Sequence, residues 1–218
     1  MLTRRAAALT PVAVLLLAAI GAHAGVPPPA ATPLSAEDRA LADQAAAYLQ
    51  GLGEVKGRFE QTGPRGGVAR GDLYLNRPGR ARFVYDPPSN LLVVANGRTV
   101  FVADPRLKTV SHYPLSATPL SLFLARQVRL DSGVAVSRVQ RFSDGYSLTL
   151  SDARRRVRGE ITLTFSSQPM RLQAWSLTDG QGQTTRVKLT GLEPVSGLDP
   201  ALFAGPDIPA SSAAPDAR

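Results

Sequence analysis

The sequence predicts a mainly β protein of the α+β class. We expect an incomplete antiparallel β-barrel of about eleven strands, with a lid of short α-helices over its concave, apolar face. From Glu54 onward apolar and polar residues alternate with a period of two, which is typical of strands with one buried face. Turn signals such as Asp104-Pro105 and Asp144-Gly145 recur at short intervals, so the strands should follow one another as a meander. Two short segments show helical spacing instead.

The first helical segment opens at Ser35, which begins a capping box, and it should end near Gly51 or Gly53. The second interrupts the strands between residues 117 and 127, where Thr118-Pro119 opens a helix. Each segment carries one narrow apolar stripe, which must lie on another apolar surface. We therefore expect both helices to cover the concave face. The predicted lid residues are Leu41, Ala45, Tyr48, Leu49, Leu120, Phe123 and Leu124.

The inner face of such a curved sheet is predicted to line a hydrophobic cavity. A lining of mostly leucine, valine and alanine cannot select a polar ligand, but it suits acyl chains. The alternative is that the same side chains fill a closed core. The hairpin of residues 91–95 and 100–103 is apolar on both faces, so we expect it in the middle of the sheet with cover on each side. The predicted cavity residues are Phe59, Leu73, Leu75, Phe83, Tyr85, Leu92, Phe101, Tyr146, Leu148, Ile161 and Leu163.

Arg77 is the main candidate for a functional polar residue. As a strand, the segment from Gly71 to Pro78 places Leu73, Leu75 and Arg77 on one face. A guanidinium on an apolar face needs acceptors, and the nearest source would be carbonyls of an element packed across that face. The alternative is that Arg77, at the end of the strand, reaches solvent.

The N-terminus has the pattern of a cleaved secretory signal peptide, with Arg4 and Arg5, an apolar run, and small residues before Gly25. A retained membrane anchor is the alternative, although the apolar run is short for a bilayer span. We expect the mature protein to be soluble outside the cytoplasm. The predicted segments are the signal peptide at 1–24, a proline-rich linker at 25–34, a single domain at 35–205 and a flexible tail at 206–218.

Composition argues against several function classes. The chain has no cysteine, so disulfides and a lipid-modified N-terminal cysteine are excluded. His112 is the one histidine after the predicted cleavage, so a histidine or cysteine metal cluster cannot form. The sequence has no serine-hydrolase elbow and no phosphate-binding glycine loop. We therefore expect no enzyme and no cofactor, and a monomer is compatible with the high charge.

The chain is basic, with a formal net charge of +8, and removal of Arg4 and Arg5 lowers this to +6. Nucleic acid is not an expected partner, because base-stacking aromatics in a basic groove are lacking. Two interpretations remain. The basic residues form a solvated face, or they attract an anionic membrane surface.

Several short motifs occur in an order and spacing that are specific when taken together. They are Phe59-Glu60-Gln61, Gly71-Asp72-Leu73-Tyr74-Leu75-Asn76-Arg77-Pro78, Phe83-Val84-Tyr85-Asp86-Pro87-Pro88, Leu92-Val93-Val94-Ala95-Asn96-Gly97, Asp104-Pro105, and the segment from Pro114-Leu115 to Pro119-Leu120. With these motifs the chain resembles, from about Ala36 to Phe203, the periplasmic outer-membrane lipoprotein carrier family, LolA.

The resemblance implies a periplasmic carrier and not an enzyme. Such a carrier accepts acylated lipoproteins from an inner-membrane LolCDE-type ABC exporter and delivers them to an outer-membrane receptor. The resemblance also implies that Arg77 forms hydrogen bonds to backbone carbonyls of the lid and keeps the empty cavity closed. The basic charge departs from the family, so delivery to the outer membrane directly is a second hypothesis. Two further interpretations stay open: a carrier of free phospholipid or glycolipid, and a lipoprotein-sensing regulatory module on the same fold.

Overall fold

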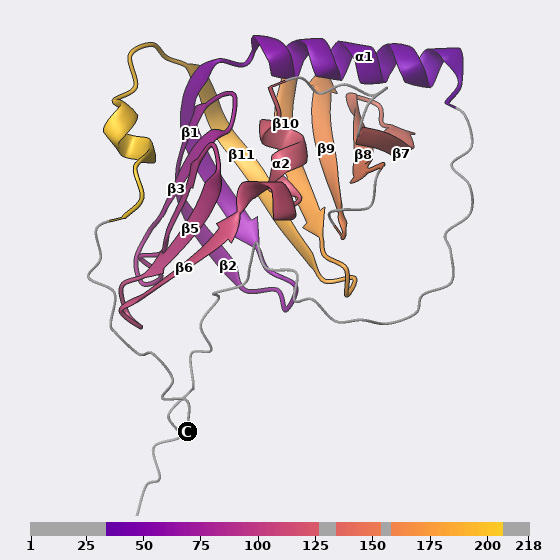
Figure 1. Cartoon of the computed structure of the whole chain (residues 1–218). Coiled ribbons are helices and arrows are strands. Elements are labelled where there is room, and N and C mark those ends of the chain that lie inside the picture. The colour runs from indigo at the N-terminus through magenta and orange to yellow at the C-terminus, as the bar shows by residue number, and fades with distance from the viewer. Residues whose placement is uncertain (1–33, 127–133, 154–157, 207–218) are drawn as a thin grey trace, which may run out of the picture.

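The computed structural model describes residues 34–126, 134–153 and 158–206 of the 218-residue chain. Within these ranges, eleven strands form one antiparallel sheet with helices against it (Figure 1). This confirms the predicted incomplete barrel with few helices. The strands are β1 (Glu54–Thr62), β2 (Val68–Asn76), β3 (Arg80–Tyr85), β4 (Leu92–Asn96), β5 (Thr99–Asp104), β6 (Thr109–Pro114), β7 (Val134–Arg141), β8 (Gly145–Asp152), β9 (Glu160–Ser167), β10 (Met170–Thr178) and β11 (Thr184–Pro194). The helices are α1 (Ala36–Gly51) and α2 (Leu120–Leu124), and the 3-10 turns are η1 (Leu115–Ala117) and η2 (Pro200–Phe203).

The sheet is a nearly complete ring of strand pairs. Its order is β6-β5-β4-β3-β2-β1-β11-β10-β9-β8-β7. Consecutive strands pair as the meander predicts, except for β6 and β7, and the first strand also pairs with the last, so that Phe59 lies opposite Leu189. Strands β6 and β7 are the two edges. The barrel is therefore open between β6 and β7, at the place in the chain where η1 and α2 interrupt the strands.

Helix α1 begins and ends where the sequence predicts. The Ser35 side chain accepts a hydrogen bond of 3.0 Å from the backbone N–H of Asp38. Asp38 also forms an ion pair of 2.8 Å with Arg141 at the end of β7, and acidic residues in the first turn suit the positive end of a helix. Figure 1 shows α1 lying across one end of the sheet, at the top of the view. Its buried residues are Ala42, Ala45, Ala46 and Leu49.

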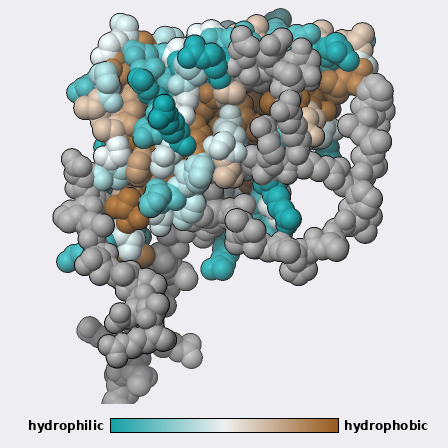
Figure 2. Space-filling model, viewed as in Figure 1, coloured by the Kyte–Doolittle hydropathy of each residue, from teal (hydrophilic) through white to brown (hydrophobic). Residues whose placement is uncertain are grey.

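The hydrophobic core lies between the concave face of the sheet and the helices. On β9, Ile161, Leu163 and Phe165 are buried, and the threonines that alternate with them are partly exposed. Burying one such side chain is worth roughly 1.5–3 kcal/mol, so each of these residues favours the packing of the lid on the sheet. In the space-filling view, hydrophobic residues show in the middle of the face that α1 and α2 cross, with polar residues around them (Figure 2).

The prediction that Leu92 and Phe101 line the concave face is wrong. Leu92 lies opposite Val84, and Phe101 lies opposite Val94, which places both on the outer face of the sheet. The pattern could not decide this, because the hairpin is apolar on both faces. The residues of β4 and β5 that contact the core are Val93, Ala95, Val100 and Val102.

The outer face of this hairpin is covered by the segment that follows β11. Turn η2 packs on β3 and β4, and its Phe203 is buried. The Leu202 carbonyl accepts a hydrogen bond of 2.9 Å from Arg82 of β3. The hairpin therefore has cover on both sides, as predicted. It does not lie in the middle of the sheet, because β5 is next to the edge strand β6.

Three predicted segments lie wholly or almost wholly outside the described residues. They are the signal peptide at 1–24, the linker at 25–34, of which only Leu34 is described, and the tail at 206–218, of which only Pro206 is described. Across the described part of the chain, no helix combines the length and the apolar character that a membrane span requires.

Candidate functional site

The candidate site is the apolar concave face together with the helices that cover it. Apart from Leu92 and Phe101, the predicted cavity residues lie on this face, and all of them are buried. They come from five strands, β1, β2, β3, β8 and β9. These residues are Phe59, Leu73, Leu75, Phe83, Tyr85, Tyr146, Leu148, Ile161 and Leu163.

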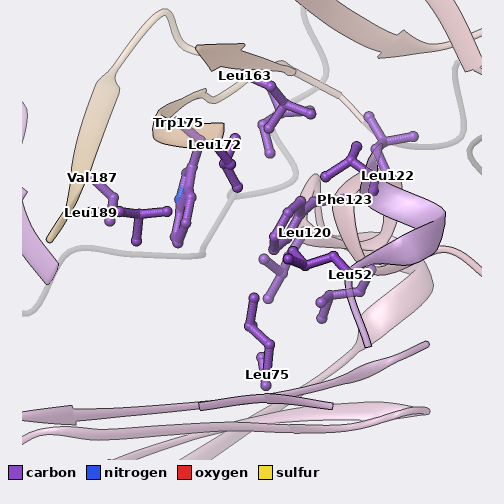
Figure 3. Packing of buried hydrophobic residues seen from close by; sticks show 14 of the residues in the cluster. Leu52, Leu75, Leu120, Leu122, Phe123, Leu163, Leu172, Trp175, Val187 and Leu189 are labelled. Carbon is purple, nitrogen blue, oxygen red and sulfur yellow. The ribbon is translucent and has the colours of Figure 1, made fainter. Parts of the chain in front are cut away.

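The predicted lid residues pack against this face. Phe123 of α2 is stacked on Trp175 of β10, with ring centroids 5.4 Å apart. In Figure 3, Leu120 and Phe123 face Trp175 and Leu172 across the core. A stacked aromatic pair adds about 0.5–1.5 kcal/mol beyond the burial of its area. Of the predicted lid residues, Ala45, Leu49, Leu120, Phe123 and Leu124 are buried, and Leu41 and Tyr48 are half-buried.

Arg77 contacts both lid helices. Its Nη1 donates to the carbonyl of Leu49, in the last turn of α1, and its Nη2 donates to the carbonyl of Ala125, directly after α2, at 2.8 Å. The last carbonyls of a helix have no partner within the helix, and they carry its partial negative charge. A cation at this place gives these carbonyls a hydrogen-bond donor and compensates their partial negative charge. Arg77 therefore has the backbone acceptors that its position in the sequence requires.

The turn around Arg77 adds one backbone contact to the lid and one to the segment between α1 and β1. The N–H of Gly79 donates to the carbonyl of Leu124 in α2 at 2.9 Å, and the N–H of Arg77 donates to the carbonyl of Gly53, directly before β1, at 3.2 Å. Gly79 has a φ of +82°, and a Cβ there would lie 2.9 Å from the Cα of Gly97. Only glycine fits this conformation and this close approach. The sequence Arg77-Pro78-Gly79 thus shapes the end of the β2–β3 hairpin to meet both helices.

The surroundings of Arg77 are largely apolar. Its guanidinium carbon lies 5.6 Å from the centre of the Phe123 ring, and its Nε has no hydrogen-bond partner among the described residues. Burial lowers the pKa of Arg77 to about 10, so the side chain stays charged at neutral pH. The hydrogen bonds to two carbonyls and the ring contact offset the cost of desolvating this charge.

Helix α1 has its own contacts to the β7–β11 half of the sheet. The Tyr48 hydroxyl accepts a hydrogen bond of 3.2 Å from the N–H of Leu172, and the Tyr146 hydroxyl donates one of 3.2 Å to the carbonyl of Leu41. Burial raises the pKa of Tyr146 to about 12, so its hydroxyl keeps its proton and remains a donor. Neither contact was predicted, because sequence spacing does not indicate which hydroxyl meets which backbone group.

Sequence reasoning missed Trp175, the largest side chain of the site. Leu172 and Trp175 are three residues apart on β10, so strict alternation places them on opposite faces. The register of β10 shifts between Leu172 and Ala174, and this bulge turns both side chains to the concave face. Two further core residues, Val187 and Leu189, alternate regularly on β11, and that pattern could have identified them.

The concave face also holds one buried polar pair. The Tyr85 hydroxyl donates a hydrogen bond of 2.7 Å to Oε1 of Gln61, and burial raises the pKa of Tyr85. Among the described residues, no group of histidine, cysteine or acidic side chains is placed to hold a metal ion. The arrangement offers an apolar binding surface with few polar contacts.

A curved, open antiparallel sheet with an apolar concave face covered by helices defines the class of open β-barrel proteins with a helical lid. Within this class, the family described as outer membrane lipoprotein carrier protein LolA matches residues 50–205 of the chain. The protein belongs to the LolA family, which is a family of carriers and not of enzymes.

Two curated relatives bear the name outer-membrane lipoprotein carrier protein. The one from Chromohalobacter salexigens is 29% identical over 184 residues, which cover 79% of this chain and 86% of the relative. The one from Shewanella loihica is 28% identical over 185 residues, with the same two shares. The crystal structure of a LolA superfamily protein from Nitrosomonas europaea is 11% identical, with a TM-score of 0.44 over 75% of this chain and 97% of that one.

Proposed function

We propose that this protein binds the acyl chains of lipoproteins on its concave face and carries them through the periplasm from the inner to the outer membrane. The observation that carries the proposal is the pair of hydrogen bonds from Arg77 to Leu49 and Ala125, which joins both lid helices over an apolar face. Membership of the LolA family, and relatives named as lipoprotein carriers, support the class of cargo.

A carrier is needed because acyl chains are costly to expose to water. Each methylene group that leaves the membrane costs about 0.8 kcal/mol, so a multiply acylated protein would not leave a bilayer unaided. The concave face, which is apolar in both the β1–β5 and the β7–β11 parts of the sheet, supplies an apolar surface in place of the membrane. Its few polar groups suit acyl chains better than any polar substrate.

Binding requires the lid to move, because its side chains pack where the acyl chains would lie. Acyl chains must displace Phe123 and Leu120 from Trp175 and Leu172, and Arg77 must release its two carbonyls. A hydrogen bond to a charged group contributes about 1.5–3 kcal/mol. This free energy opposes loading and is regained on release, so a closing lid helps to expel the cargo. We call Arg77 the latch.

The carrier would exchange cargo with partners at both membranes. We propose an inner-membrane LolCDE-type ABC exporter as the donor, and an outer-membrane receptor or the outer membrane itself as the acceptor. The secretory signal in residues 1–24 would bring the protein to the periplasm, where it would act as a monomer without a cofactor.

Mass spectrometry of the native protein isolated from periplasm tests the proposal. We expect triacylated proteins to copurify with the wild type, and in larger amounts with Arg77→Leu, because this variant lacks the latch. Free phospholipid or glycolipid as the bound species would instead favour a lipid-transfer role. If neither form carries any lipid or lipoprotein, the carrier function is contradicted and the sensing module on the same fold is favoured.

A further inference from the structure

The turn between β5 and β6 presents an apolar side chain to solvent between two cations. Leu107 is 60% exposed, a larger fraction than that of Val68 (52%) or Phe142 (44%), the other large apolar residues exposed in the described part of the chain. Its neighbours Arg106 and Lys108 are exposed as well. A small apolar tip flanked by basic residues matches the interface of an anionic lipid surface, where apolar groups insert and cations meet headgroups.

Hydrogen bonds within this turn fix its backbone, and they therefore also fix Leu107 in its exposed position. The buried Asp104 carboxylate accepts hydrogen bonds from the backbone N–H groups of Arg106, at 2.9 Å, and Leu107, at 3.2 Å. Pro105 restricts the backbone before them. Lys108 has a φ of +53° and reverses the chain into β6. Leu107 therefore stands at the apex of a rigid turn.

The cations at this end of the sheet are free to meet an external anion. Arg106 and Lys108, and Arg65 of the β1–β2 turn, have no ion-pair partner within the described ranges. Two carboxylates at this end already have other partners. Asp104 accepts hydrogen bonds from the backbone of its own turn, and Asp86 pairs with Arg58. The β1–β2 and β5–β6 turns both lie at the end of the sheet away from α1 (Figure 1). Figure 2 shows a small hydrophobic patch toward the lower left, on the side of the molecule where β5 and β6 lie.

The turn also lies beside the opening of the barrel. Strand β6 is one of the two edges that border the gap between β6 and β7. A membrane bound at the β5–β6 turn would therefore lie next to the break in the ring of strands. A rigid apolar tip, and cations without an ion-pair partner in the described ranges, thus lie at one end of β6, a strand that borders this gap.

We propose that the β5–β6 turn is a membrane-contacting surface, in which Arg106 and Lys108 bind an anionic lipid surface and Leu107 inserts into its interface. The use of this surface in cargo delivery rests on the proposed function, whereas its binding to lipid does not. In cargo delivery, this surface would bring the carrier to a bilayer surface and not only to a receptor protein.

Vesicle sedimentation with cargo-free protein tests this surface. The vesicles are phosphatidylcholine alone, or phosphatidylcholine mixed with phosphatidylglycerol. We expect binding to the anionic vesicles only, and weaker binding as salt is added. The double variant Arg106→Glu, Lys108→Glu should bind at least tenfold more weakly, because each cation near an anionic surface is worth about fivefold in affinity. Leu107→Asp should also bind several-fold more weakly.

The matched control is Phe142→Asp, which places the same acidic residue at an exposed apolar position in the β7–β8 turn. That turn follows Arg141, which pairs with Asp38 at the start of α1. It therefore lies at the opposite end of the sheet from the β5–β6 turn. We expect this variant to bind like the wild type. Equal losses for Leu107→Asp and Phe142→Asp, binding that added salt does not weaken, or no binding by the wild type would each overturn the proposal.

A second measurement separates this proposal from the carrier function. Each variant is also tested for binding of a fluorescent triacylated peptide. If the wild type binds this peptide but no vesicles, the membrane surface is wrong and the carrier function stands. If it binds anionic vesicles through Leu107 but not the peptide, the carrier function is wrong and the membrane surface stands.

Discussion

The guanidinium of Arg77 lies 2.8 Å from the carbonyl oxygen of Ala125, the residue that follows α2, and its other terminal nitrogen donates to Leu49 of α1. Two helices that are far apart in the sequence therefore share one cation, and this cation is fixed to the β2–β3 turn. Because both contacts belong to one side chain, the loss of either weakens the placement of the other. We expect α1 and α2 to leave their closed positions in one step when Arg77 releases the two carbonyls.

The first prediction concerns the latch. Arg77→Leu removes both hydrogen bonds to the lid and leaves the apolar surface in place. The variant should bind a triacylated peptide at least as tightly as the wild type, and should transfer it to acceptor vesicles at least tenfold more slowly, because lid closure no longer helps to expel the cargo. Transfer of a fluorescent triacylated peptide measures both quantities.

Arg77→Lys is the matched control for charge. A lysine keeps the cation, but it lacks the planar fork that reaches two carbonyls at once, so its transfer rate should lie between those of the wild type and Arg77→Leu. Transfer by Arg77→Leu at the wild-type rate would remove the latch from the mechanism.

The second prediction concerns the packing of α2. Phe123→Ala removes the ring that stacks on Trp175 and should destabilise the closed lid by about 3 kcal/mol, the lower end for a buried phenylalanine. Trp175 is the one tryptophan of the chain and is 2% exposed, so its fluorescence reports on the lid. Quenching by acrylamide should rise severalfold in the variant. The exposed Val68→Ala serves as the control, and unchanged quenching in Phe123→Ala would show that α2 does not cover Trp175.

The third prediction concerns the inner wall of the sheet. A Cβ at Gly71 would collide with the carbonyl oxygen of Val84 and would lie 2.8 Å from the Phe59 ring. Gly71→Ala should therefore lower the free energy of unfolding by about 3 kcal/mol, which urea denaturation measures. Gly53→Ala is the control, because no atom lies within 4 Å of the added carbon, and it should change stability by less than about 0.5 kcal/mol. Equal stabilities for the two variants would show that Gly71 does not pack tightly against Val84 and Phe59.

The regular parts of the site could be predicted from the sequence. On β8 and β9, alternation identifies Leu148, Ile161 and Leu163 correctly, because one face is apolar and the other carries serine and threonine. Arg77 could be identified because a cation among leucines requires acceptors. The same reasoning predicts carbonyls of a packed element as its partners, and the family resemblance places these carbonyls in the lid, but neither identifies Leu49 and Ala125.

The irregular parts could not be predicted. Leu92 and Phe101 lie in a hairpin that is apolar on both faces, and η2, which covers the outer face, follows β11 far along the chain. Trp175 was missed because a bulge in β10 interrupts the alternation. The position of the gap between β6 and β7 depends on the pairing of β1 with β11, a contact between the two ends of the domain that no local pattern indicates.

The proposed mechanism requires α1 and α2 to move apart to admit acyl chains to the concave face. The chain has no cysteine, so spin labels can be attached at Ala47→Cys on α1 and Ala117→Cys on η1, both of which are exposed. Pulsed electron paramagnetic resonance then measures the distance between the labels with and without a bound triacylated peptide. We predict that the distance becomes longer and more widely distributed when the peptide is bound. An unchanged distance distribution with the peptide fully bound would show that the lid does not open to admit acyl chains.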